Sequence, residues 1–120
     1  MSANVYLIAH VVGITMVFMA LGGAALHALN GGGKEDNRSR GLLAAFHGTG
    51  LLIMLVSGFA MLAKLSLDFS GWVVGKLVVW LLLGAALSIV LRNPQKARIL
   101  WWSLPVLGGL AAWLAVTKPF

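Results

Sequence analysis

Four side chains with an ionisable nitrogen lie within long apolar stretches of the chain: His10, His27, His47 and Lys76. An ionisable group in such a stretch is costly, so each of them is a candidate functional residue. A neutral imidazole supplies a ligand nitrogen for a metal ion or a haem iron, and an ammonium group pairs with carboxylates. These residue types therefore suggest that the protein binds a cofactor.

Four apolar runs contain or accompany these residues, and each is long enough to cross a bilayer as a helix. They are Val5–Leu29, Gly41–Ala63, Trp72–Leu91 and Ile99–Thr117, with 25, 23, 20 and 19 residues. A helix rises about 1.5 Å per residue and the hydrocarbon core is about 30 Å thick, so each run can span it. We therefore expect an all-α integral membrane protein, an up-down four-helix bundle forming one transmembrane domain over residues 1–120.

The composition excludes several classes of protein. Of the 120 residues, 60% are hydrophobic and only 10% are charged, which is too apolar for an ordinary soluble enzyme. The chain has no Cys, so disulfides, thiolate metal sites and covalent attachment of haem through Cys are excluded. The spans contain no Asp or Glu, which argues against a metal site built from protein ligands alone and against a proton relay.

The basic residues indicate the orientation of the spans. Six of the nine Lys and Arg residues lie in the first and third loops, at 30–40 and 92–98, which four spans place on the same side. The positive-inside rule then puts these loops in the cytoplasm and both termini outside, as in a bacterial inner membrane protein. The lipid bilayer is thus the expected surrounding, and the net charge of +6 does not require a nucleic-acid partner.

Depth in the membrane divides the candidate residues into two pairs. His10 and Lys76 are each a few residues from the outer end of their spans, whereas His27 and His47 lie toward the inner end. His10 and His47 are both candidate metal ligands, but they differ in depth by roughly 15–20 Å at 1.5 Å per residue. We therefore do not expect them to share one metal ion.

The side chains around the histidines suit a flat, bulky ligand. On a helix, His47, Met54, Gly58 and Met61 share one face of the second run, and small residues share a face of the first run with His27. Haem b fits this set, because His and Met are axial ligands and a cation such as Lys76 can pair with a propionate. Met61 lies near the depth of His10 and is a candidate sixth ligand.

Each candidate also has a structural explanation. His10 and His47 can be hydrogen-bonded within the bundle, His27 can cap a helix end, Lys76 can extend to the outer interface, and the methionines can be packing residues. The sequence leaves these alternatives open.

Three short motifs resemble those of a known family. Trp72-Val-Val-Gly-Lys76 opens the third run, Val116-Thr-Lys-Pro-Phe120 ends the chain, and His10 lies early in the first run. Together they resemble the HemJ-type membrane proteins, an oxygen-independent class of protoporphyrinogen oxidases, and the small SirB-type and CopD-like membrane proteins are similar. The resemblance implies haem b, with His10 and Lys76 as haem or porphyrin contacts. The chain departs from the HemJ-type enzymes at Gly84–Ser88, where they carry a Tyr-His pair.

Three functions remain in competition. The first is a b-type haem protein that acts in electron transfer or in haem and porphyrin handling. The second, implied by the resemblance, is oxidation of protoporphyrinogen IX with transfer of electrons to quinone. The third is a cofactor-free membrane subunit or small-molecule-binding module. A quinone, a redox partner protein and a second copy of the chain are the partners to consider.

Overall fold

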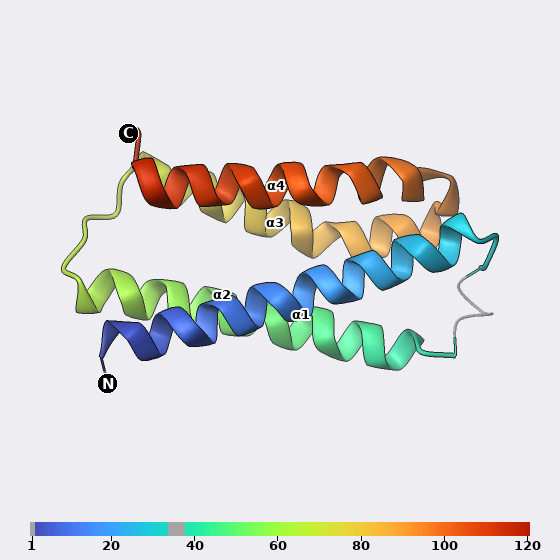
Figure 1. Ribbon diagram of the computed structural model, residues 1–120, viewed down its shortest axis with the longest axis horizontal. Coiled ribbons are helices and arrows are strands. Elements are labelled where there is room, and N and C mark those ends of the chain that lie inside the picture. The colour runs from blue at the N-terminus through green and yellow to red at the C-terminus, as the bar shows by residue number, and fades with distance from the viewer. Residues whose placement is uncertain (1, 34–37) are drawn as a thin grey trace.

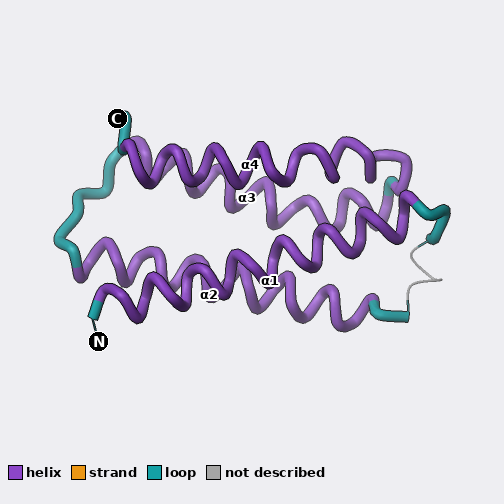
Figure 2. Tube along the Cα trace, viewed as in Figure 1, coloured by secondary structure: helices purple, strands orange, loops and turns teal. Residues whose placement is uncertain are grey.

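Four α-helices make up almost all of the structure, a computed structural model that describes residues 2–33 and 38–120. The helices are α1 (Ala3–Leu29), α2 (Arg40–Lys64), α3 (Gly71–Arg92) and α4 (Ala97–Thr117), with a short 3₁₀ turn η1 (Pro94–Lys96) before α4. Their bounds lie within two residues of the four predicted runs, and the described residues contain no strand (Figure 2). The prediction of four helices is confirmed.

Successive helices run in opposite directions, so the bundle has two distinct ends (Figure 1). Both termini lie at one end, which we call the terminal end. The other end, which we call the basic end, carries residues 30–33, 38–40 and 92–98, with Arg38, Arg40, Arg92, Lys96 and Arg98. The remaining basic residue of these loops, Lys34, lies outside the described residues.

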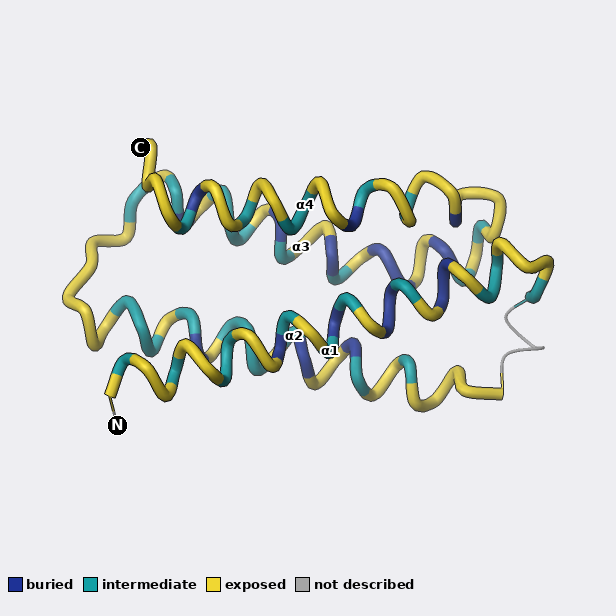
Figure 3. Tube along the Cα trace, viewed as in Figure 1, coloured by how far each residue is buried: buried dark blue, intermediate teal, exposed yellow. Residues whose placement is uncertain are grey.

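The helices are long and apolar enough to cross a membrane, and their outer surfaces are apolar as well. Large hydrophobic side chains are exposed on every helix; Ile99, Trp102 and Val106 are each 68% exposed. In Figure 3 the exposed positions recur along the outside of all four helices. Such a surface is unfavourable in water and suits contact with lipid.

The closest helix pair is α1 with α2, and two glycines make this approach possible. A Cβ atom on Gly13 would lie 2.9 Å from the carbonyl oxygen of Gly50, and one on Gly50 would lie 2.8 Å from the carbonyl oxygen of Gly13. Small residues let membrane helices come into backbone contact, where dispersion forces and weak hydrogen bonds stabilise the pair. The register of α1 against α2 is therefore set at this crossing.

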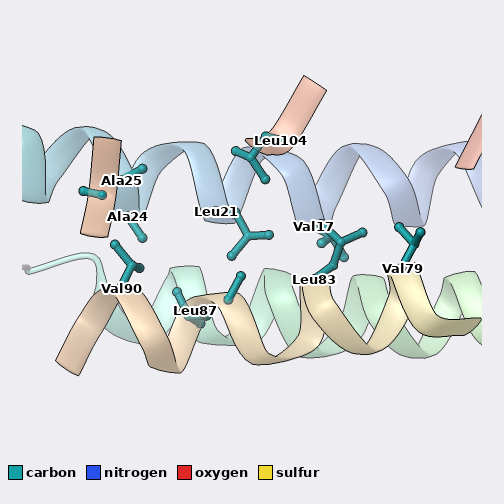
Figure 4. Packing of buried hydrophobic residues seen from close by; sticks show 11 residues of the cluster. Val17, Leu21, Ala24, Ala25, Val79, Leu83, Leu87, Val90 and Leu104 are labelled. Atoms are coloured by element: carbon teal, nitrogen blue, oxygen red, sulfur yellow. The ribbon is translucent and has the colours of Figure 1, made fainter. Parts of the chain in front are cut away.

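A compact core joins α1 to α3 and α4 in the middle of the bundle and toward the basic end. Val17 and Leu21 of α1 are fully buried; Val17 lies beside Leu83 of α3, and Val90 of α3 lies beside Ala24 and Ala25 (Figure 4). On the side of the terminal end this core stops at Val17, Val79 and Leu104. The two helix pairs diverge beyond that level (Figure 1).

Two reciprocal hydrogen bonds tie α2 to α3. The Nε2 atom of His47 donates to the carbonyl oxygen of Leu83 at 2.9 Å, and the Nε1 atom of Trp80 donates to that of Leu51 at 3.0 Å. A helical carbonyl already accepts one backbone hydrogen bond and has a second lone pair for such a donor. These bonds orient the face of α3 that carries Lys76 and Trp80 toward α2.

Candidate functional site

His10 is held on α2 by its Nδ1 atom. This nitrogen lies 3.0 Å from the carbonyl oxygen of Met54 and 3.0 Å from the hydroxyl of Ser57, which itself donates to Ile53. Because a carbonyl oxygen can only accept, Nδ1 must carry the proton. The neutral imidazole of His10 then has its lone pair on Nε2, which is the arrangement that metal-ligating histidines usually have.

A gap in the surface of α2 receives the His10 ring. Gly58 has no side chain, and a Cβ atom there would lie 3.4 Å from Cε1 of the ring. Gly58 follows Met54 by one helical turn, so its missing side chain leaves the Met54 carbonyl accessible from α1. Gly58, which lies on the same face of α2 as His47 and Met61, therefore makes room for the His10 ring.

Lys76 lies at the same level as the His10 ring, on the opposite helix pair. It precedes Trp80 by one turn on the face of α3 that is turned toward α2, about 6 Å nearer the terminal end. In the part of the chain that the structure describes, the ammonium group of Lys76 has no hydrogen bond and no acidic partner. Lys76 and the His10 ring thus lie near one level of the bundle, and their joint action on a ligand stays a prediction.

The motif that opens α3 and the motif that ends the chain meet beside this pair. The backbone N–H of Trp72 donates to the carbonyl oxygen of Phe120 at 2.9 Å, and the ammonium of Lys118 lies 5.3 Å from the centre of the Trp72 ring. The terminal end therefore gathers positive charge near His10, without an ion pair among residues 2–33 and 38–120 to neutralise it.

The buried core cluster does not extend to the level of His10 and Lys76. No member of the buried core cluster lies on the terminal side of Val17, Val79 or Leu104. His10, Met61 and Lys76 are all partly exposed, and Ser57 is the buried polar residue among them.

His47 and His27 have different environments from His10. The ring of His47 is buried, and its Nε2–H donates to the carbonyl oxygen of Leu83. The His10 ring lies against Gly58, which is eleven residues from His47 along α2, or roughly 16 Å. Two imidazoles on one metal ion lie within about 4 Å, since each metal–nitrogen bond is about 2 Å. The structure therefore keeps His10 and His47 apart, as their depths predict.

The ring of His27 closes the end of α1. Its Nε2 atom donates to the carbonyl oxygen of Gly33 at 2.9 Å, and Gly32 packs so closely on the ring that a Cβ atom could not be accommodated there. His27 and His47 thus bind different backbone carbonyls. The structural explanation, a histidine capping the helix end, accounts for His27.

Two members of the site were not singled out from the sequence. Ser57 and the Met54 carbonyl orient His10, but a serine and a backbone group carry no signal of their own in an apolar run. The position of Ser57, one residue before Gly58, is the single clue that the sequence offers. Within the described ranges, no cluster of three His, Cys, Asp or Glu side chains is present to hold a bare metal ion.

Comparisons with family models, with curated proteins and with solved structures give no match. The function must therefore be inferred from the site itself.

Proposed function

We propose that the protein is an integral membrane protein that binds b-type haem between its two helix pairs at the terminal end. The observation that carries the proposal is the hydrogen bond from His10 Nδ1–H to the Met54 carbonyl, which leaves Nε2 with a lone pair facing away from α2. Neither His27 nor His47 presents Nε2 in this way. The residues at this end fit the group, because they offer one oriented imidazole and the ammonium of Lys76, which has no ion-pair partner among the described residues.

Each residue has a distinct role in this proposal. His10 would hold the haem iron, Ser57 and Gly58 position the His10 ring, and Lys76 would pair with a propionate. Met61, one turn beyond Gly58, is the candidate for the second axial position. Haem supplies one-electron redox chemistry when bound, and the apolar surroundings limit access of water to it.

The proposed place of action is a bacterial inner membrane with the terminal end outside. The five described basic residues at the basic end support this orientation through the positive-inside rule. His10 and Lys76 would then lie in the outer leaflet, where a quinone or an external redox partner could exchange electrons with the site.

The test is an absorption spectrum of the full chain purified in detergent, oxidised and then reduced, with and without added haem. A Soret band with sharp reduced α and β bands is expected if the iron has two axial ligands. A broad reduced band that shifts with carbon monoxide is expected if His10 is the one protein ligand. Absence of any Soret band after haem titration contradicts the proposal and favours the cofactor-free alternative.

Protoporphyrinogen oxidation is a second candidate, and one observation favours it. The residues that resemble the HemJ-type motifs, Trp72, Lys76 and Lys118–Phe120, gather at one end of the bundle beside His10. Expression in a bacterium that lacks its own protoporphyrinogen oxidase should then restore growth. A haem-loaded, membrane-inserted protein that does not restore growth would limit the function to haem binding or electron transfer.

A further inference from the structure

The outer surface of α3 and α4 forms an open groove at the basic end of the bundle. Its volume is about 780 Å³, and its lining includes Leu82 and Ile89 of α3 and Ile99, Trp102 and Val106 of α4. These five side chains are all more than two-fifths exposed. The groove is therefore an apolar depression that runs along the surface of the helices. This surface faces lipid if the chain crosses a membrane.

Two basic side chains stand at the end of this groove. Lys96 ends the η1 turn and Arg98 lies in the first turn of α4, and both belong to the groove lining. Neither side chain forms a hydrogen bond or an ion pair with any residue of 2–33 or 38–120. The groove thus joins an apolar surface to two cations that no described residue neutralises, at the level where a span meets the headgroup region.

From this combination we infer that the groove is a binding site for an anionic phospholipid. The phosphate would lie between Lys96 and Arg98, and an acyl chain would follow the apolar surface between α3 and α4. Basic pockets between membrane helices recognise acidic headgroups in this manner. A zwitterionic lipid fits less well, because its own ammonium group would be repelled by the same two cations.

Phosphatidylglycerol is the probe for this site, with phosphatidylcholine as the neutral competitor. The full chain is mixed with equal amounts of the two lipids in detergent, and bound lipid is counted by native mass spectrometry. Each basic residue near an acidic lipid contributes roughly a fivefold preference, so the pair predicts about a 30-fold enrichment of phosphatidylglycerol. Equal retention of the two lipids would overturn the proposal.

A matched pair of double variants separates the groove from the general charge of the basic end. K96Q/R98Q is expected to abolish the enrichment, whereas R38Q/R40Q removes two charges from the same end outside the groove and should preserve it. An equal loss in both variants would show unspecific attraction to basic residues and would contradict a site.

A second pair of variants tests the groove without changing charge. Val106→Trp fills the groove, whereas Val116→Trp adds the same side chain to an exposed position of α4 that is not part of it. Only the first should lose bound phosphatidylglycerol. A protein that dimerises without lipid and is made monomeric by Val106→Trp would assign the groove to a second copy of the chain, and so would overturn the lipid site.

Discussion

The Nδ1 atom of His10 lies 3.0 Å from the carbonyl oxygen of Met54, a residue 44 positions later in the chain and on the neighbouring helix. This one bond fixes the tautomer of the imidazole and the direction in which its free nitrogen points. The bond can form because α1 and α2 touch at Gly13 and Gly50, which lie about one helical turn from His10 and Met54 respectively. The candidate ligand and the helix crossing are therefore parts of one arrangement.

Replacing His10 should remove haem in a way that a soluble ligand can repair. His10→Gly is expected to lose the Soret band, and added imidazole should restore it, because the vacated space accepts a free ligand. His47→Leu serves as the control. Because Nε2 of His47 is hydrogen-bonded to the Leu83 carbonyl, this replacement should leave the spectrum unchanged. If His47→Leu loses haem and His10→Gly keeps it, the ligand assignment is wrong.

Loss of the Lys76 charge should weaken binding without changing the ligand. Lys76→Met is expected to lower haem affinity by about 10-fold to 100-fold, the usual effect of losing a hydrogen bond to a charged group. Lys76→Arg keeps the charge and should recover most of the affinity. Haem titration followed at the Soret maximum measures both, and the positions of the reduced bands report an unchanged axial ligand. Equal affinities of wild type and Lys76→Met would exclude the propionate role.

Because α1 and α2 cross closely at Gly50, Gly50 and its neighbour Gly48 should differ in how well they tolerate a side chain. Gly50→Ala would bring a Cβ atom to 2.8 Å from the Gly13 carbonyl oxygen, so the helices must separate, whereas Gly48→Ala meets nothing within 4 Å. We expect Gly50→Ala to lower the free energy of unfolding by about 1–3 kcal/mol, the cost of overpacking. Gly48→Ala should leave it unchanged or slightly raised. The free energies of unfolding of the two variants are compared in mixed micelles. Similar values would contradict the close contact of α1 and α2 at Gly50.

The reciprocal bonds between α2 and α3 should contribute to stability and leave the cofactor in place. His47→Leu deletes one donor at nearly constant volume, and Trp80→Phe deletes the other donor together with part of the indole. Interhelical hydrogen bonds in membrane proteins are worth about 0.6 kcal/mol on average and up to about 1.7 kcal/mol, so each variant should lose an amount in that range. The same unfolding measurement tests this, with Trp113→Phe, an exposed tryptophan of α4, as the neutral control.

Much of the candidate site could be anticipated from depth alone. His10 and Lys76 were expected at one level because each lies a few residues from the same end of its span, and the structure places them there. The function of the three histidines could not be separated in this way. An imidazole in an apolar run can bind a metal, cap a helix end or hydrogen-bond two helices together. Which of these roles it has depends on which carbonyl oxygen lies within about 3 Å of the ring.

The sequence by itself determined the four helices and their limits, because hydrophobic runs of this length and their polar interruptions reflect the local free energy of placing each residue in a membrane. It also determined which polar groups share a level. Tertiary structure alone decided that His10 binds α2 over Gly58, that His47 ties α2 to α3, and that His27 closes α1 on Gly33. The physical reason is that helix rotation and crossing depend on the close packing of small residues from different helices, which no single apolar run encodes.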